Sequence, residues 1–311
     1  MHSTRQLFMP EGPEVTTLTA AMRRKFRPEA YKLTDLQITS GRYENTLPEG
    51  WQQLRENLPL SLHSVHEKGK FMYFQLERGI SLWSTLGMSG AWTMRPDPRF
   101  LRMRLLLERA DHLEGKEMLQ LNYADKLQYG TFKVCFEPAE LEARLKKLGP
   151  SWLHGEVSLE VFRALLKKKG APQKKRSLAV FLMDQTKTCG IGNYILSEAL
   201  YAAGIHPWAK VGALNDDDID RLYKALSYII WTSAELQQEY SARRFFGAGS
   251  PFVKQEVLSK FGGGSGCGGH FDLQVYGKQF TPNGLLVLHD SKGPHKRPIF
   301  WVPQVQTAAT P

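Results

Sequence analysis

Two glycines and an asparagine stand at the start of an expected helix, in the stretch TCGIGNYILSEAL, Thr188–Leu200. Gly190 and Gly192 let the backbone come close to a ligand, because glycine has no Cβ atom. Asn193 is of a residue type that caps the helix after it. Free backbone N–H groups at a helix start attract phosphate. The stretch therefore predicts a helix start that binds a phosphate.

A second stretch that could do chemistry lies near the amino terminus. MPEGPEV, Met9–Val15, has the form of a protein start, yet the eight residues MHSTRQLF precede it. These are too few for a secretory signal, which needs about 15–30 residues with an apolar centre. An internal proline nitrogen is an amide without a usable lone pair, whereas a free α-amino group has a pKa of about 7.7–8.0. The true first residue therefore decides whether Pro10 carries an amine.

Metal chemistry is the third candidate, and the sequence argues against it. The three cysteines, Cys135, Cys189 and Cys267, are widely spaced, which is typical of a reducing compartment and not of a disulfide framework. Cys267 with nearby histidines is an alternative metal site, but the spacing matches no structural zinc pattern. The histidines in question are His270, His289 and His295. We expect no cofactor and no zinc.

The overall charge indicates an acidic partner. The chain has 311 residues, a formal net charge of +10 and 42% hydrophobic residues, which suits two domains or slightly more. A surplus of this size favours nucleic acid first and an anionic membrane surface second; a basic but otherwise ordinary enzyme is the alternative. No run approaches the roughly 18 apolar residues of a membrane helix.

The elements that must position these motifs begin with a β-rich part. Helical spacing over Pro13–Phe26, with Glu14 in the first turn, predicts a helix. Gly69–Trp92 contains two apolar runs divided by ERG, which predicts a hairpin. Further strands are expected in 99–108, 117–125 and 129–137. The apolar face of the first helix would carry Val15, Leu18, Met22 and Phe26.

From about Leu148 the pattern becomes helical. Ser158 is a plausible cap for one helix, and 177–185, 194–204 and 216–241 have helical period and propensity. The basic run Lys167–Arg176 is either a solvated face or part of a DNA-facing field. After the glycine-rich 261–271, strand character returns, with turns at TPNG and SKGP.

Five segments together resemble the Fpg/Nei family of DNA glycosylases with lyase activity. They are MPEGPEV, KGKF, LGMSG, GIGNYILSEALYAAGIHP and KRPIFWVPQVQ, in this order, and the resemblance covers Met9 to about Gln306. It implies an α+β fold: an N-terminal antiparallel β-sandwich flanked by helices, a helix–two-turns–helix domain and a C-terminal β-hairpin finger. The implied boundaries are 1–8 for an extension absent from the mature enzyme, 9–147, 148–260, 261–306 and a tail at 307–311.

The resemblance assigns the chemistry to the amino-terminal proline. Pro10, exposed by removal of Met9, would attack the deoxyribose, displace the damaged base and leave an iminium that permits strand cleavage by elimination. Glu11 would protonate the opening sugar and shuttle protons. We therefore expect translation to start at Met9, or the extension to be removed by processing.

The same resemblance assigns the DNA contacts. Lys70, Asn193 and Arg297 would hold phosphates at the lesion. Met88, Leu127 and Tyr129 would fill the gap left when the damaged nucleotide is flipped out. The family often has arginine in place of Leu127 and phenylalanine in place of Tyr129, which puts the preference for the opposite base in doubt.

The C-terminal segment departs from the zinc-binding pattern of many members. Val302 and Val305 stand at the spacing of the second cysteine pair, so the resemblance implies a zincless finger packed through Phe300 and Trp301. This feature and Leu127 favour a Nei-like member that acts on oxidised pyrimidines and ring-opened purines, with 8-oxoguanine less favoured.

We expect a bifunctional glycosylase and lyase, a monomer without a membrane partner, that binds damaged double- or single-stranded DNA in a basic cleft between its domains. It would be intracellular, in a nucleus, an organelle, or a bacterial or viral cytoplasm. One alternative is a catalytically silent protein that binds damaged DNA, if the extension is retained. Another is a DNA-topology protein or a ribosomal protein that shares only the helix–two-turns–helix element. The PEGPE opening argues against this alternative.

Overall fold

The computed structural model describes residues 10–26, 30–110, 118–168, 175–246, 272–291 and 297–306. These residues form two compact units. The sheet unit holds Pro10, 14–146 and 236–246, and the helical unit holds 11–13, 147–235 and all described residues from 272 onward. Each unit is therefore built from separate stretches of the chain.

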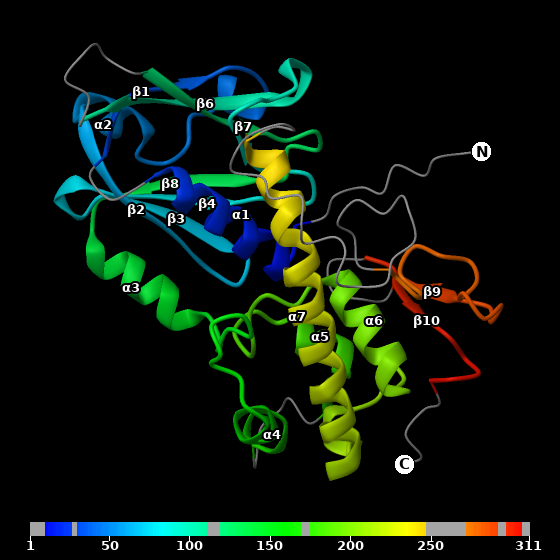
Figure 1. Ribbon diagram of the computed structural model, residues 1–311. Helices are drawn as coiled ribbons and strands as arrows, with labels where there is room; N and C mark the ends of the chain where they lie inside the picture. The colour runs from blue at the N-terminus through cyan, green and yellow to red at the C-terminus, as the bar shows by residue number, and fades with distance from the viewer. Residues whose placement is uncertain are drawn as a thin grey trace. The chain divides into compact units, whose positions relative to one another are not determined.

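The sheet unit contains one antiparallel sheet of eight strands in the order β5-β7-β6-β1-β2-β3-β4-β8. Figure 1 shows β1, β6 and β7 in one layer and β2, β3, β4 and β8 in the other, which confirms the predicted sandwich. The strands are β1 (Tyr31–Ile38), β2 (Leu60–Lys68), β3 (Phe71–Leu76), β4 (Ser81–Thr85), β5 (Ala91–Thr93), β6 (Leu101–Arg109), β7 (Met118–Ala124) and β8 (Thr131–Cys135).

Alternating strands and one amphipathic helix build the core of this unit. In β6 every second residue from Leu101 to Leu107 is buried, as a strand with one core face requires. Helix α1 (Gly12–Lys25) carries three of the four apolar residues predicted for one face and Phe26 follows its last residue; all four are buried in the same core. The last turn of α7 (Asp216–Phe246) adds Ala242, Phe245 and Phe246 to it. Two further helices, α2 (Trp51–Glu56) and α3 (Pro138–Lys147), complete the described helices here.

The helical unit contains the helix–two-turns–helix element. Helix α5 (Leu178–Met183) leads through two turns into α6 (Asn193–Ala203), and both helices are almost wholly buried. Ser158 caps α4 (Leu159–Lys167) as predicted, because its side chain accepts the Val161 N–H. The core shared by α4, α5, α6 and α7 is one apolar cluster.

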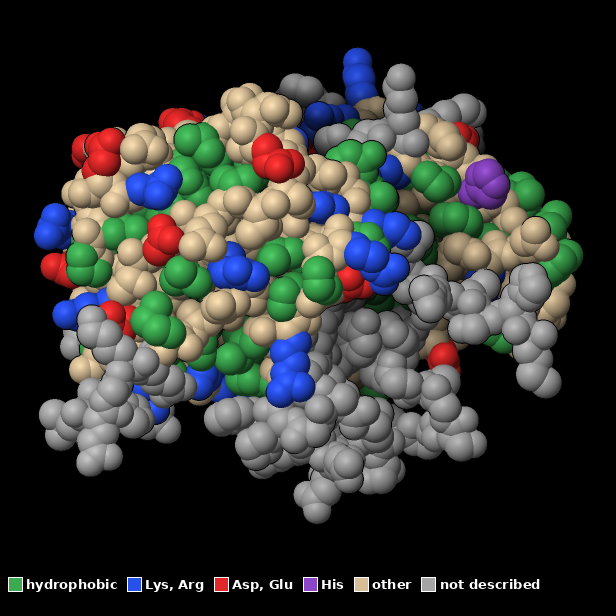
Figure 2. Space-filling model, turned by 90° about the horizontal axis from the view of Figure 1, so that it is seen from above, with side chains coloured by type: hydrophobic (Ala, Val, Ile, Leu, Met, Phe, Trp, Pro, Cys, Tyr) green, Lys and Arg blue, Asp and Glu red, His purple; other side chains and the backbone are tan. Residues whose placement is uncertain are grey.

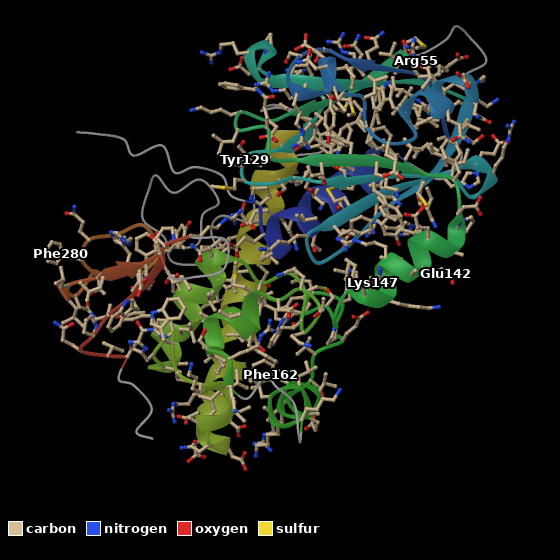
Figure 3. All side chains as sticks on the ribbon, turned by 180° about the vertical axis from the view of Figure 1, so that it is seen from behind. Arg55, Tyr129, Glu142, Lys147, Phe162 and Phe280 are labelled. Carbon is tan, nitrogen blue, oxygen red and sulfur yellow. The ribbon has the colours of Figure 1, made fainter. Side chains whose placement is uncertain are left out.

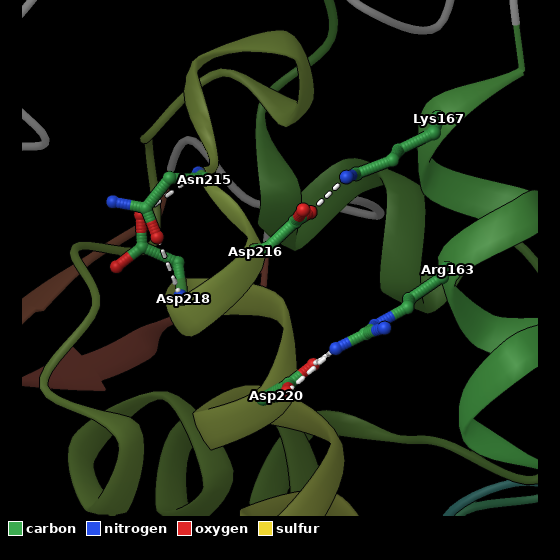
Figure 4. A network of polar contacts seen from close by, with 6 residues as sticks. All are labelled: Arg163, Lys167, Asn215, Asp216, Asp218 and Asp220. Atoms are coloured by element: carbon green, nitrogen blue, oxygen red, sulfur yellow. Dashed lines mark hydrogen bonds and ion pairs between the residues drawn. The ribbon is translucent and has the colours of Figure 1, made fainter.

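Charged contacts join the start of α7 to α4 (Figure 4). Arg163 donates to both carboxylate oxygens of Asp220, at 2.5 and 2.7 Å, and Lys167 pairs with Asp216. Asn215 and Asp218 exchange backbone-to-side-chain hydrogen bonds across the first turn of α7, a capping box. Both partners of the Arg163–Asp220 pair are about one-third exposed, with side-chain exposures of 39% and 31%.

The C-terminal segment forms a two-stranded antiparallel hairpin of β9 (Leu288–Asp290) and β10 (Ile299–Trp301). It has a small core of its own, in which Val275, Val287 and Val302 are buried. The predicted turn at TPNG is present, closed by the Gly284 N–H on the Thr281 carbonyl. Only Ser291 of the predicted SKGP turn lies within the described residues. Phe280, by contrast, stands outward from this segment (Figure 3) and is 56% exposed.

The surface mixes charge types. On the face drawn in Figure 2, Lys and Arg side chains stand at separate points among apolar and acidic ones. Within the described part of the chain, no helix combines the length and the hydropathy that crossing a bilayer requires.

Candidate active site

The residue that follows Pro10 is bound to the start of α6. The carboxylate of Glu11, 3% exposed, accepts the backbone N–H of Tyr194 at 3.0 Å and that of Ile195 at 3.3 Å. These are N–H groups of the first helical turn, which have no partner within the helix, and the positive end of the helix dipole favours an anionic group there. A side chain 183 residues away in sequence therefore caps α6.

This contact corrects two predictions about the helix start. Asn193 does not cap α6, because Gly192 occupies the N-cap position and Asn193 is the first helical residue. The N–H groups of Tyr194 and Ile195 are not free for phosphate, because they donate to Glu11. The sequence could not indicate either point, since both depend on a segment that folds back from the amino terminus.

A backbone contact fixes the neighbouring residue. The Gly12 N–H donates to the Gly190 carbonyl at 2.9 Å, and a Cβ on Gly12 would lie 2.9 Å from the same carbonyl oxygen. The Gln185 side chain holds this loop from within, because it accepts the Gly190 N–H and donates to the Ile191 carbonyl, each at 2.9 Å. Gly190, one of the two glycines predicted for close approach, therefore lies against another part of this chain.

Asn193, Tyr276 and Arg297 form a polar group beside Glu11. The amide of Asn193 donates to the Pro298 carbonyl at 2.6 Å, which places it against the residue after Arg297. Burial and then the charge of Glu11 raise the pKa of Tyr276 to about 12, while an Asn193 hydrogen bond and the charge of Arg297 act in the opposite direction. The Tyr276 hydroxyl therefore stays protonated at neutral pH and can donate.

A second buried carboxylate holds the segment that carries Tyr276. Glu198 on α6 is 1% exposed and accepts three consecutive backbone N–H groups, from Gln274 at 2.8 Å, Val275 at 3.0 Å and Tyr276 at 2.8 Å. Burial raises the pKa of Glu198, and the three hydrogen bonds oppose that rise. From the same helix, Ser197 accepts the Phe300 N–H of β10. Two successive α6 residues therefore fasten residues 274–276 and Phe300.

Of the predicted residues of the sheet unit, Pro10 precedes α1 and the other four lie in turns or loops. Pro10 is buried, and Lys70 is partly exposed in the turn between β2 and β3, with Gly69 in the left-handed region at φ 61°. Met88 is in the turn that follows β4, and Leu127 and Tyr129 are in the loop between β7 and β8. Tyr129, labelled in Figure 3, is 59% exposed and Leu127 is 36% exposed.

The structure brings together the two loops that carry the residues predicted to fill the gap. Gly87, at φ +60°, packs so closely that a Cβ there would lie 2.7 Å from the Gly130 nitrogen. The Leu127 N–H donates to the Ser89 hydroxyl at 2.8 Å. The turn that carries Met88 and the loop that carries Leu127 and Tyr129 are therefore direct neighbours, as their assigned common task requires.

Other candidate residues have ordinary surroundings. Cys135 and Cys189 are buried, and burial raises the pKa of the Cys135 thiol. The described residues contain no group of three or more His, Cys, Asp or Glu side chains that could hold a metal. Cys267, His270 and His295 lie outside the described residues, as do 169–174 of the basic run. Lys167 and Arg176, at its two ends, pair with Asp216 and Asp184.

Three functional candidates escaped the sequence analysis: Asp125, Glu198 and Tyr276. Asp125 had a local signal, because aspartate is a residue type that favours turns by accepting the N–H two residues on. In the structure it accepts the Leu127 N–H in this way. Glu198 is an acid on the buried face of a helix, a place where an acid needs partners. Tyr276 had no signal, since its position depends on Glu198.

Comparison with known proteins agrees with this fold. Residues 9–132 match the formamidopyrimidine-DNA glycosylase N-terminal domain, and residues 148–244 match the formamidopyrimidine-DNA glycosylase H2TH domain. Two solved structures of the Lactococcus lactis Fpg, one in complex with DNA containing an abasic site and one with DNA containing an oxidised pyrimidine, each align with a TM-score of 0.70 at 22% identity. Each alignment covers 96% of this chain and 100% of that one. The architecture is therefore that of Fpg-type proteins.

Sequence relatives carry the assignment further. A formamidopyrimidine-DNA glycosylase from Thermus thermophilus is 32% identical over 233 residues, which cover 73% of this chain and 77% of the relative. One from Lactococcus lactis is 28% identical over 257 residues, covering 82% and 88%. The chain belongs to the formamidopyrimidine-DNA glycosylase family.

Proposed function

We propose that this protein is a bifunctional DNA glycosylase and AP lyase of base excision repair, with the nitrogen of Pro10 as its nucleophile. One observation carries the proposal: Glu11, the residue after Pro10, is a buried carboxylate bound to the start of α6, in a chain of this family. A carboxylate so held is a fixed group next to the attacking amine, as proton transfer requires.

Besides DNA and the Pro10 amine, the chemistry needs only water, which hydrolyses the final iminium and releases the amine. The neutral secondary amine of Pro10 attacks C1′ of the deoxyribose, and the damaged base leaves with the glycosidic electron pair and a proton. The amine nitrogen loses its proton, and its lone pair forms the iminium as the C1′–O4′ bond breaks and O4′ takes up a proton. Removal of a C2′ proton then expels the 3′ phosphate by elimination, and Glu11 is the group proposed to move protons in these steps.

Phosphate contacts would come from Lys70, Asn193 and Arg297. Asn193 donates to the Pro298 carbonyl and also hydrogen-bonds Tyr276, and these contacts fix the orientation of its amide. Tyr276, which stays protonated, adds a hydroxyl to the same polar group. Arg297 brings a guanidinium fork, which is suited to phosphate oxygens.

For substrates, we propose oxidised pyrimidines and ring-opened purines, with little discrimination of the opposite base. Leu127 is apolar and cannot hydrogen-bond an orphaned base, so it would fill space without reading it. A panel of duplexes that pairs each lesion with each of the four bases measures this. Excision rates that differ by more than about tenfold between opposite bases would contradict it.

The mechanism is tested by borohydride trapping on abasic DNA. A chain that begins at Pro10, verified by intact mass, should form a covalent adduct, whereas a chain that retains residues 1–9 should not. Pro10→Gly in the shortened chain should reduce trapping sharply. Equal trapping by the extended chain would refute the amine mechanism. Binding of abasic DNA without any adduct from the shortened chain would favour a catalytically silent damaged-DNA-binding protein.

A further inference from the structure

Asp125 is the first residue of the loop between β7 and β8, and its carboxylate accepts four hydrogen bonds. It is 1% exposed. One oxygen accepts the Leu127 N–H at 3.2 Å and the Ser89 hydroxyl, and the other accepts the Gly130 N–H at 2.9 Å and the Tyr123 hydroxyl at 3.3 Å. All four donors belong to the loop, to the strand before it or to the neighbouring turn.

The neighbouring turn is tied in through Ser89. Its hydroxyl donates to Asp125 and accepts the Leu127 N–H, so it joins the Met88 turn to the Leu127 loop. The Gly90 N–H closes the turn on the Leu86 carbonyl at 2.8 Å, and Tyr123 reaches the same carbonyl at 3.4 Å. Burial, then the charge of Asp125, raise the pKa of Tyr123 well above its usual range, so its hydroxyl remains a donor.

Two arginines hold the outside of the loop. The Arg42 guanidinium donates to the Gly130 carbonyl and to the Tyr43 hydroxyl, and its backbone N–H donates to the Gln128 side chain. Arg102 donates to the Asp125 carbonyl at 2.8 Å. The loop is thus fixed at three of its six residues, by the Arg102 side chain of β6 and by the side chain and backbone of Arg42, which follows β1.

The Asp125 carboxylate of the loop is directed inward, while Lys126, Leu127 and Tyr129 are exposed. Asp125 and Gly130 are buried, but Leu127 and Tyr129 are among the most exposed large apolar side chains described in this unit. An apolar side chain ordered before binding loses less conformational entropy when it enters a DNA stack than a mobile one. The network therefore has the arrangement expected of a preformed wedge.

We propose that Asp125 is a positioning residue that couples the Met88 turn to the Leu127–Tyr129 loop, so that the three side chains enter the gap in damaged DNA as one rigid wedge. This inference rests on the proposed function. It assigns Asp125 no contact with the reacting atoms. Its prediction is specific to duplex DNA, since only a duplex has an opposite strand and a stack to be filled.

The principal test is Asp125→Asn, which keeps the volume of the side chain but turns an amide NH₂ toward donors. Two rates are compared: single-turnover excision from a lesion-bearing duplex, and borohydride trapping at a single-stranded abasic site. The ratio of the duplex rate to the single-strand rate should fall about tenfold, because buried donors of the loop lose their acceptor. A purely structural loss would lower both rates together. Asp97→Asn, at an exposed carboxylate that pairs with Arg99, is the matched control and should leave the ratio unchanged.

A spectroscopic readout follows the wedge directly. A duplex with a tetrahydrofuran abasic analogue and 2-aminopurine beside it reports stacking as fluorescence. Binding of the original protein should change the fluorescence, and Asp125→Asn should lose most of that change at saturating protein concentration. If Asp125→Asn does not fold, Ser89→Ala, which removes only the link between the two loops, should give the same direction with a smaller loss.

A double substitution separates coupling from independent effects. If Asp125 acts through the wedge, adding Asp125→Asn to Leu127→Ala should change the duplex rate by less than twofold beyond Leu127→Ala alone. Fully additive losses, or an unchanged duplex-to-single-strand ratio in Asp125→Asn, would overturn the inference. Failure of the unsubstituted chain that begins at Pro10 to trap single-stranded abasic DNA would instead overturn the proposed function.

Discussion

Two buried carboxylates organise the two units, and they do so over different distances along the chain. Asp125 in the sheet unit accepts N–H groups two and five residues away and a hydroxyl 36 residues away. Glu11 in the helical unit accepts N–H groups 183 and 184 residues away. The first gives shape to a local loop. The second joins the amino-terminal segment to a helix that the chain forms much later.

The difference shows where chemistry and shape reside. Around Asp125 the polar network is internal, and the loop exposes two large apolar side chains, Leu127 and Tyr129, beside Lys126. Around Glu11 the polar groups are themselves the proposed reactants and phosphate ligands. Substitutions near Asp125 should therefore change how DNA is bound, whereas substitutions near Glu11 should change whether the bonds of the damaged nucleotide are cleaved.

The largest expected effect comes from Glu11→Gln. This substitution removes the proposed proton carrier and replaces one acceptor of the α6 N–H groups by a donor. Adduct formation with abasic DNA in borohydride should fall by about 100-fold or more, because general acid–base groups contribute about 10²–10⁴-fold. Glu142→Gln, at an exposed helix position, is the control and should trap normally. If Glu11→Gln lost adduct formation only on duplex DNA, Glu11 and Asp125 would not differ in the way proposed here.

Glu198→Gln should have the next largest effect, on stability. One of the three N–H groups of residues 274–276 would face an amide donor, so the free energy of unfolding should fall by about 1–3 kcal/mol, measured by urea denaturation. Burial raises the pKa of Glu198 in the folded state. At pH values between the unfolded pKa of about 4.3 and the raised folded pKa, the folded state binds more protons than the unfolded state. The contribution of Glu198 to stability is therefore lost as pH rises through the folded pKa. Glu198→Gln should lack this pH dependence. If its free energy of unfolding changed with pH in parallel with that of the original protein, the prediction would be contradicted.

Two glycines give a matched test of crowding in the two regions. An alanine Cβ at Gly12 would lie 2.9 Å from Gly190, and one at Gly87 would lie 2.7 Å from Gly130, with Gly87 also at positive φ. Each Gly→Ala change should lower the free energy of unfolding by about 1–3 kcal/mol, read from thermal denaturation. Gly155→Ala, at φ +72° with open space around it, isolates the cost of backbone conformation. If Gly87→Ala lowers the free energy of unfolding no more than Gly155→Ala does, the Met88 turn and the Leu127–Tyr129 loop can move apart at little cost.

The smallest effect is expected where charges are exposed. Arg163→Ala removes the hydrogen-bonded pair with Asp220, which is partly solvated, so the free energy of unfolding should change by about 1 kcal/mol or less. The difference should shrink further in 0.5 M salt. A loss above about 2 kcal/mol would show that exposed pairs rival the buried carboxylates in holding the helical unit together.

Most of the elements could be predicted from periodicity, and the exceptions have a physical cause. The helix over Pro13–Phe26, the β3–β4 hairpin and helices α4 to α7 follow simple periods, and all are present. Strands β1 and β2 gave no clear pattern, because register shifts at Leu33–Asp35 and Leu62–Ser64 interrupt the alternation of buried and exposed residues.

The candidate site divides in the same way. Residue types near Pro10, Lys70 and Arg297 could be matched to a family pattern along the chain. The partner of the α6 N–H groups could not, because a contact across 183 residues leaves no mark in local spacing. Asn193 illustrates this: its type suggests a cap, but Gly192 takes the N-cap position and Glu11 the role of acceptor.

The contribution of Ala242, Phe245 and Phe246 to the core of the sheet unit has a practical consequence for dissecting this protein. A gene fragment that stops at the break near residue 147 omits these side chains, so the expressed polypeptide would expose the apolar surface they cover and would tend to aggregate. Co-expression with a fragment that includes 236–246 supplies them in trans. A split-protein reporter is therefore better divided in a surface turn than at the junction of the two units.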